Sequence, residues 1–261
     1  SPEKLDIEIL ETSALEDMSG VCRIIAACQE FGVNFSLDDF GTGYSSLSYL
    51  KRLSVNQLKI DQSFVRDMLD DPDDMTILEG MISLAGAFRK EVIAEGVESV
   101  EHGHLLLLLG CDLAQGYGIA RPMPGEQLPA WISGWQPDPG WRGVRPLRRE
   151  YLPALFAIVE HRAWVAELAS GLQGQGEAPA HELGKCKFVA WIESMRLLHP
   201  LRQQAFAEVD AVHRQMHAQA ITVLDRHAHG DAGAAQAGVD ELQSLCGDLQ
   251  TRLNALVLSL D

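Results

Sequence analysis

The sequence has few cysteines and no long apolar run. Five cysteines are scattered through the 261 residues at unrelated spacings: Cys22, Cys28, Cys111, Cys186 and Cys246. A sparse, odd-numbered set of this kind excludes a disulfide scaffold and favours a reducing compartment, so a cytoplasmic location is expected. The run HLLLLLG at 104–110 is far shorter than a bilayer requires, so no membrane segment is expected.

Positive charge is also scarce. The chain has 21 Lys and Arg against 37 Asp and Glu, which gives a formal net charge of -16 at pH 7. Without a basic face, a nucleic-acid polymer is excluded as a bulk partner. An anionic ligand could bind only through metal ions or a few placed cations. Hydrophobic residues make up 46% of the chain, enough to bury a core, which argues against disorder.

The chain has two parts with different patterns. In residues 1–132, amphipathic stretches alternate with the β-like runs LDIEIL, NFSL, QLKI, EVIAEGV and DLAQGYGI, which predicts the α/β class with a parallel sheet or barrel. Residues 133–146 are dense in Gly, Pro and Trp, which indicates a linker. Residues 147–261 carry four long helical patterns, which predict an all-α domain, an antiparallel four-helix bundle. The segment HAHGDAGAAQAG, 227–238, is expected to be the connection before its last helix.

Polar side chains follow each predicted strand of the first part. Neighbouring parallel strands end at one rim, so we expect these residues to converge there: Glu8, Glu11, Asp38, Asp39, Lys59, Asp61, Glu95, Glu98 and Gln115. Several carboxylates in one cleft stay ionised only beside a cation, and hard oxygen ligands select Mg²⁺, Mn²⁺ or Ca²⁺. Such a cluster predicts phosphodiester hydrolysis. Taken alone, the Asp-Asp-Phe-Gly segment could equally be a strand-to-loop turn.

Five motifs carry a resemblance to a known family. LDIEILE, DDFGTGYSSLSYL, LKIDQSFV, VIAEGVES and LGCDLAQGYGIARPM resemble, in order, the motifs of the EAL family, phosphodiesterases that hydrolyse cyclic di-GMP to linear pGpG. The resemblance covers about residues 2–132 and implies a partial EAL-type (β/α) barrel, TIM-like, with Mg²⁺ or Mn²⁺ as cofactor. It implies the following roles: Glu8, Asp38 and Asp39 bind the metal, Glu95 is the general base or a second-metal ligand, Lys59 orients water or substrate, Glu98, Gln115 and Asp61 support the site, and Glu11 anchors the loop after Asp39.

The family's Glu-Ala-Leu strand, its following Arg and a metal-binding Asn precede the motif with which this chain begins. We therefore expect the C-terminal part of an EAL barrel, which belongs to a longer polypeptide with an upstream sensor or GGDEF domain, because a half-barrel would expose unpaired strand edges. The expected function is that of a cyclic di-GMP phosphodiesterase. The alternatives are a catalytically inactive EAL module that binds cyclic di-GMP or a protein partner, and a dimeric structural element.

The helical part contains a second constellation, in the segments HRAW, CKFVAW and HRQMH. They supply His161, Cys186, His213 and His217. The last two lie four residues apart on one helical face. One thiolate and three imidazoles from three helices suit tetrahedral Zn²⁺. In the alternative, the cysteine is a small core residue and the histidines are solvated.

The order of these residues resembles the chemoreceptor zinc-binding (CZB) domain, over about residues 148–260. The resemblance implies a zinc- or oxidant-sensing regulatory domain, since a zinc-bound thiolate is oxidisable, and it implies a homodimer. Val189 stands where that family usually has Gly, and His199, next to Pro200, is an alternative ligand.

Overall fold

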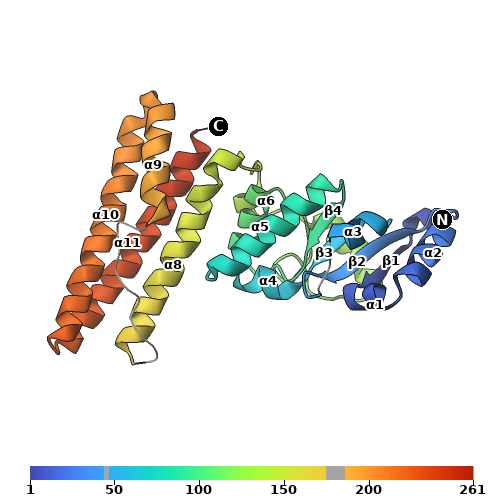
Figure 1. Ribbon diagram of the computed structural model, residues 1–261, viewed down its shortest axis with the longest axis horizontal. Helices are drawn as coiled ribbons and strands as arrows, with labels where there is room; N and C mark the ends of the chain where they lie inside the picture. The colour runs from blue at the N-terminus through green and yellow to red at the C-terminus, as the bar shows by residue number, and fades with distance from the viewer. Residues whose placement is uncertain (44–46, 175–185, 261) are drawn as a thin grey trace. The chain divides into compact units, whose positions relative to one another are not determined.

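The computed structural model describes residues 1–43, 47–174 and 186–260 (Figure 1). These residues divide into two compact units. The sheet unit comprises residues 1–69 and 73–147, and the helical unit comprises residues 70–72 and 148–261. Across the described ranges, no helix has both the length and the apolar character needed to cross a bilayer.

Five parallel strands form the sheet, in the order in which they occur in the chain. They are β1 (Asp6–Leu10), β2 (Asn34–Phe40), β3 (Gln57–Ile60), β4 (Glu91–Ala94) and β5 (Leu113–Ala114). Helices connect and follow them: α1 (Glu11–Glu16), α2 (Met18–Gln29), α3 (Leu47–Arg52), α4 (Gln62–Asp67), α5 (Pro72–Ala87), α6 (Val100–Leu109) and α7 (Leu128–Gly134). The sheet formed by the described residues is open, with β1 and β5 at its edges. A parallel α/β unit consistent with part of an EAL barrel is therefore present, as the sequence predicts.

The central strands carry the core of the sheet unit. Phe35 and Leu37 of β2 and Leu58 and Ile60 of β3 are almost completely buried, which fits the apolar character of strands covered on both faces. Along β1, by contrast, exposed and half-buried residues alternate. The strands end in register, because Leu10 pairs with Asp38 and Ile60 with Ala94. The polar residues that follow the strands thus meet at one edge of the sheet.

The strand boundaries differ from the prediction. β2 continues through Asp38 and Asp39 to Phe40, and its register against β3 shifts between Leu37 and Phe40. β4 and β5 are shorter than expected, because the chain turns at Gly96 (φ +76°) and Gly116 (φ +156°). The residues that directly follow β4 and β5 therefore form loops.

The predicted linker, residues 133–146, packs against α6. A 3-10 helix at Pro139–Trp141 places the Trp141 ring over Gly103, where a Cβ atom would lie 2.6 Å from the indole. The indole Nε1 of Trp141 donates a hydrogen bond to the Val100 carbonyl at 2.8 Å. At the other end of α6, the Leu147 N–H donates to the Leu108 carbonyl, also at 2.8 Å. We call this arrangement the α6 strap.

The helical unit contains four long helices, which Figure 1 labels: α8 (Leu152–Leu172), α9 (Lys187–Leu198), α10 (Gln203–Ala228) and α11 (Ala232–Leu258). α10 packs along α11, α11 packs on α8, and α9 packs on both α8 and α10. The prediction that 227–238 is the connection is wrong at both ends, because residues 227–228 belong to α10 and residues 232–238 to α11. Gly230 (φ +81°) makes the turn, and the Asp231 side chain caps α11 by accepting from the Ala234 N–H. The alanines that follow Asp231 are strong helix formers.

Candidate functional site

Three carboxylates meet at the carboxyl edge of the sheet. Asp38 and Asp39 belong to the end of β2, and Glu95 directly follows β4. One oxygen from each lies within 4.8 Å of the other two. Asp39 has a left-handed backbone (φ +53°), which Asp tolerates better than most residues. This irregular strand end turns two consecutive carboxylates toward the same place.

Lys59 of β3 supplies a cation to these carboxylates. Its side chain is almost buried, and its Nζ lies 2.8 Å from Asp38 Oδ1, 2.6 Å from Glu95 Oε1 and 2.9 Å from Glu8 Oε1. Burial alone would lower the pKa of Lys59, but these three partners outweigh it and raise the pKa above the ordinary value. The ammonium group therefore stays charged at neutral pH.

The carboxylates repel one another despite Lys59. Burial, followed by the charges of Asp38 and Asp61, raises the pKa of Asp39. Burial also raises the pKa of Glu95; Lys59 opposes this effect, while the charges of Asp38 and Glu8 add to it. A second cation beside the cluster would relieve this repulsion.

Glu11 lies below the loop that follows Asp39. It is completely buried at the start of α1, and its Oε2 accepts hydrogen bonds from the N–H groups of Gly41 at 3.0 Å and Gly43 at 3.1 Å. A side chain on Gly41 would meet Met81 and Phe64, and the residue has φ +105°. Small residues and a buried acceptor thus fix the start of this loop.

The remaining predicted residues lie around the cluster. Gln115 Nε2 donates to Glu95 Oε1 at 2.5 Å. Asp61 caps α4 by accepting from the Ser63 N–H at 3.0 Å, and its charge acts on Asp39. Glu98 is exposed, outside the carboxylate cluster, and its backbone N–H donates to Nδ1 of His102 at 3.3 Å. Glu95, Glu98 and Gln115 all line one open cleft of about 620 Å³.

The carboxylate set fits a hard divalent cation. Asp38, Asp39 and Glu95 offer oxygen atoms that are close enough to share one ion, and each of the three residues is half-buried. Glu8 is absent from this close group, although Lys59 links it to Asp38 and Glu95. Mg²⁺ or Mn²⁺ would suit such donors.

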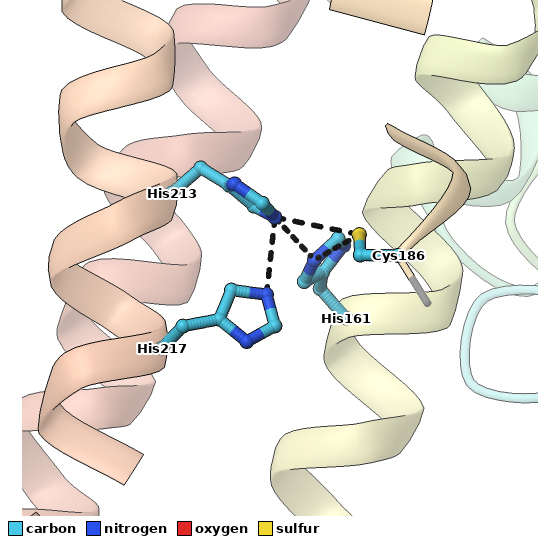
Figure 2. A group of neighbouring side chains, drawn as sticks. All are labelled: His161, Cys186, His213 and His217. Carbon is cyan, nitrogen blue, oxygen red and sulfur yellow. Dashed lines mark hydrogen bonds between the residues drawn. The ribbon is translucent and has the colours of Figure 1, made fainter. Parts of the chain in front are cut away.

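A second group of side chains lies inside the helical unit. Figure 2 shows His161 from α8, Cys186 at the start of α9, and His213 and His217 from α10 pointing toward one another. The Nε2 atom of His213 lies 3.1 Å from Nε2 of His161 and 3.0 Å from Nε2 of His217. The Cys186 sulfur lies 3.5 Å from Nε2 of His213 and 3.7 Å from Nε2 of His161.

These separations are close to the edges of a tetrahedral zinc site, with the two nitrogen pairs slightly shorter. With Zn–N near 2.1 Å and Zn–S near 2.3 Å, a tetrahedron separates two nitrogens by about 3.4 Å, and nitrogen and sulfur by about 3.6 Å. The four donor atoms all lie within 4.8 Å of one another. The residues present therefore fit zinc. His199, the alternative ligand, lies elsewhere, with its Nε2 3.4 Å from the Tyr151 hydroxyl.

Protonation of these histidines also favours metal ligation. His161 Nδ1 lies 2.6 Å from the Ala157 carbonyl, which can only accept, so Nδ1 carries the proton and Nε2 presents a lone pair to the cluster. Burial lowers the pKa of His161. Burial, with the neighbouring His161 and Arg214, lowers the pKa of His213 to about 3. Burial raises the pKa of the Cys186 thiol.

Aromatic rings hold the imidazoles in place. Trp164 stacks on His217 with ring centroids 5.1 Å apart, and Phe188 meets the His213 ring edge-on at 4.9 Å. The Trp and Phe of the two sequence motifs thus pack on the histidines of the third. Because the rings cannot rotate freely, the donor atoms keep their directions.

The chain has a carboxylate cluster at the carboxyl edge of a parallel sheet and a Cys-His₃ cluster among helices. The two clusters define a two-part protein with two metal-binding chemistries. Residues 1–122 match the family model of the EAL domain, and residues 161–224 match that of the chemoreceptor zinc-binding domain. The chain therefore combines an EAL domain with a chemoreceptor zinc-binding domain, and both predicted resemblances are confirmed.

Two curated relatives from Pseudomonas aeruginosa match the first half. The bifunctional diguanylate cyclase/cyclic di-GMP phosphodiesterase MucR is 41% identical over 132 residues, which is 51% of this chain and 19% of MucR. The cyclic di-GMP phosphodiesterase PA2567 is 40% identical over 128 residues, 49% of this chain and 22% of that protein. The chain thus spans about a fifth of their length.

A solved structure also matches the first half: the PaMucR phosphodiesterase in complex with c-di-GMP, with a TM-score of 0.48 and 42% identity, covering 49% of this chain and 51% of the other.

Sequence reasoning missed one side of the cleft. Tyr117, Arg121 and Trp131 line it beyond Gln115, and the Arg121 guanidinium lies over the Tyr117 ring at 4.7 Å from its centroid. The sequence did carry a signal for this part of the cleft, which was an aromatic residue and an arginine four positions apart, shortly after the end of β5. Trp131 follows ten residues later and has no such local signal.

Proposed function

We propose that the native polypeptide hydrolyses cyclic di-GMP to linear pGpG at the carboxylate cluster of the sheet unit. The observation that carries the proposal is the convergence of Asp38, Asp39 and Glu95, two of which pair with Lys59 and one of which, Glu95, lines an open cleft. The relatives' names supply the substrate: MucR and PA2567 are described as cyclic di-GMP phosphodiesterases.

In this proposal each residue has a defined task. Asp38, Asp39 and Glu8 hold a Mg²⁺ or Mn²⁺ ion, which when bound would neutralise phosphoryl charge and make water more acidic. Glu95, whose pKa is raised by burial and which accepts hydrogen bonds from Lys59 and Gln115, takes the proton of the attacking water. Lys59 orients Glu95 and Asp38, and Asp61 and Glu98 support the surrounding loops. Glu11 holds the loop after Asp39.

Replacing one predicted ligand tests this function. We expect Asp38→Asn in the native polypeptide to lower pGpG release by more than about 100-fold, since even partners outside the ligand shell commonly account for 10- to 100-fold. The matched control is Asp67→Asn, a half-exposed carboxylate paired with Arg66, which should leave turnover unchanged. Unchanged turnover in Asp38→Asn would refute the assignment. Cyclic di-GMP binding without turnover in the unsubstituted protein would instead favour the receptor alternative.

We further propose that residues 147–261 form an antiparallel four-helix bundle that binds one zinc ion through His161, Cys186, His213 and His217 and regulates the phosphodiesterase. The support is the donor geometry, because the four donor atoms all lie within 4.8 Å of one another and four of their separations run from 3.0 to 3.7 Å. Peroxide or hypochlorous acid would oxidise the thiolate and remove a ligand. Residues 1–132 would then be the EAL part, residues 133–146 the connection, and a homodimer the regulated form.

A further inference from the structure

The cleft of about 620 Å³ is lined by two chemically different groups of side chains. One group is polar and consists of Glu95, Glu98 and Gln115, which follow β4 and β5. The other group consists of Tyr117, Arg121 and Trp131. Both groups line the same hollow, so a ligand whose phosphate reaches Glu95 can also meet a side chain of α7.

Trp131, a residue of α7, lines this cleft. It is half-buried, and its ring centroid lies 6.0 Å from that of Trp135, with the planes tilted by 43°. Trp135 itself does not line this cleft; it lines a separate apolar cavity of about 180 Å³ together with Trp141. Trp131 therefore lines the cleft, whereas Trp135 does not.

Tyr117, with the Arg121 guanidinium over its ring, lines the same cleft. An indole and a phenol–guanidinium pair in one cleft favour a flat, electron-rich ring as the ligand. Arginine also matches the O6 and N7 acceptors of guanine better than those of adenine, which carries a donor at the corresponding position. Aliphatic or small ligands would use neither feature.

We propose that Trp131 is a specificity-determining residue on which a guanine base of the substrate stacks when the phosphodiester lies at Glu95. The inference rests on the proposed function for its substrate class and assigns to α7 a role in recognition. Base stacking on an aromatic side chain is commonly worth about 5- to 100-fold in affinity. Trp131 contributes this to substrate binding and nothing to the chemical step.

The test compares two phosphodiesters in the native polypeptide. Cyclic di-GMP carries two guanines, whereas bis(p-nitrophenyl) phosphate has none and needs only the carboxylate cluster. We expect Trp131→Ala to raise KM for cyclic di-GMP by about 10-fold or more, with kcat and bis(p-nitrophenyl) phosphate hydrolysis unchanged. Trp131→Phe should restore most of the KM. The matched control, Trp135→Ala, should leave the KM for cyclic di-GMP within about twofold of the unsubstituted value.

An unchanged KM in Trp131→Ala, or an equal rise in Trp135→Ala, overturns the stacking role. If the unsubstituted protein binds cyclic di-GMP but hydrolyses neither compound, the proposed function fails, and the same variants are compared by calorimetric Kd, which tests stacking independently. A protein that neither binds nor hydrolyses cyclic di-GMP overturns both proposals. Loss of bis(p-nitrophenyl) phosphate hydrolysis in Trp131→Ala also overturns the stacking role, because it shows that Trp131 acts on hydrolysis itself and not on a guanine base.

Discussion

At the scale of single residues, the two sites limit the charge of their side chains in different ways. Lys59 places one ammonium among Glu8, Asp38 and Glu95, so these carboxylates are partly neutralised before any metal arrives. The helical cluster has no comparable internal charge, because burial keeps His161 and His213 neutral and keeps the Cys186 thiol protonated. The first site can therefore exist as an ion pair, whereas the second needs a metal to ionise its thiol.

The pKa shifts at the zinc site predict how many protons zinc binding releases. The pKa values of His161 and His213 are lowered, so both are neutral at pH 7, while the raised pKa of Cys186 leaves its thiol protonated there. Zinc requires the thiolate, so binding should release about one proton more in the unsubstituted protein than in Cys186→Ser. Because Cys186 must lose this proton, zinc affinity should rise about tenfold for each unit of pH increase near neutral pH.

Calorimetry in buffers of different ionisation enthalpy measures this proton release. The matched control is Cys246→Ser, a buried cysteine on α11 that lies outside the zinc cluster, which should release as many protons as the unsubstituted protein. Equal proton release in Cys186→Ser and the unsubstituted protein would show that the thiol is not a ligand.

The sequence predicts the residues of both sites because each follows a pattern with a physical meaning. Carboxylates after parallel strands must share an edge, and His213 and His217 at four residues' spacing must share a helix face. The sequence could not predict that Glu8 approaches the cluster through Lys59, because its position depends on a buried lysine side chain of another strand. Nor could it predict Trp131 in the cleft, since only the folded chain brings α7 beside the loop after β5.

At the scale of elements, the α6 strap depends on a glycine in α6, which has no side chain. Gly103 allows the Trp141 indole to lie on the helix, and an added Cβ would lie 2.6 Å from the ring. Trp141 then reaches the Val100 carbonyl with its N–H. A glycine within a helix normally destabilises it, so its presence in α6 is explained by this packing.

Gly103→Ala should therefore destabilise the sheet unit, by about 1–3 kcal/mol, because Trp141 must be displaced from the helix. Gly80→Ala is the matched control: Gly80 lies within α5 of the same unit, and no atom lies within 4 Å of its added Cβ. That substitution should stabilise by up to about 1 kcal/mol, since alanine is the better helix former. Denaturant unfolding of both variants measures the difference; a neutral Gly103→Ala would mean that Trp141 does not pack there in solution.

The residues at which helices and strands begin and end were the hardest to predict from the sequence. β4 and β5 look longer in the sequence because apolar residues continue past their ends, yet Gly96 and Gly116 turn the chain away from the sheet. α11 looks shorter because glycines interrupt its start, yet Asp231 caps it. In both cases a backbone angle or a cap overrides the hydrophobic pattern.

At the scale of the whole molecule, zinc should stabilise one unit and not the other. Three helices supply its ligands, so zinc bound to the folded helical unit shifts that unit's unfolding equilibrium, by about 2.7 kcal/mol at free zinc 100 times the Kd. Thermal unfolding of the chain should show a transition that rises with zinc and falls with a chelator. Any transition of the sheet unit should not move.

His217→Ala should abolish the zinc-dependent rise, while His227→Ala should retain it. His227 is an exposed residue of α10 outside the zinc cluster, so it controls for the loss of a histidine from the same helix. A zinc-dependent rise of equal size in His217→Ala would argue against ligation by these histidines. Elemental analysis of the purified variants gives the stoichiometry, expected to be one zinc per chain.

The α6 strap has a mechanical consequence. The chain that leaves the sheet unit is tied to α6 near both ends, at Val100 through Trp141 and at Leu108 through Leu147. Tension on that chain is therefore borne first by α6 and its two hydrogen bonds, not by the strands. Because α6 begins directly after the loop that carries Glu95 and Glu98, a pull at Leu147 acts on the helix that follows these two carboxylates.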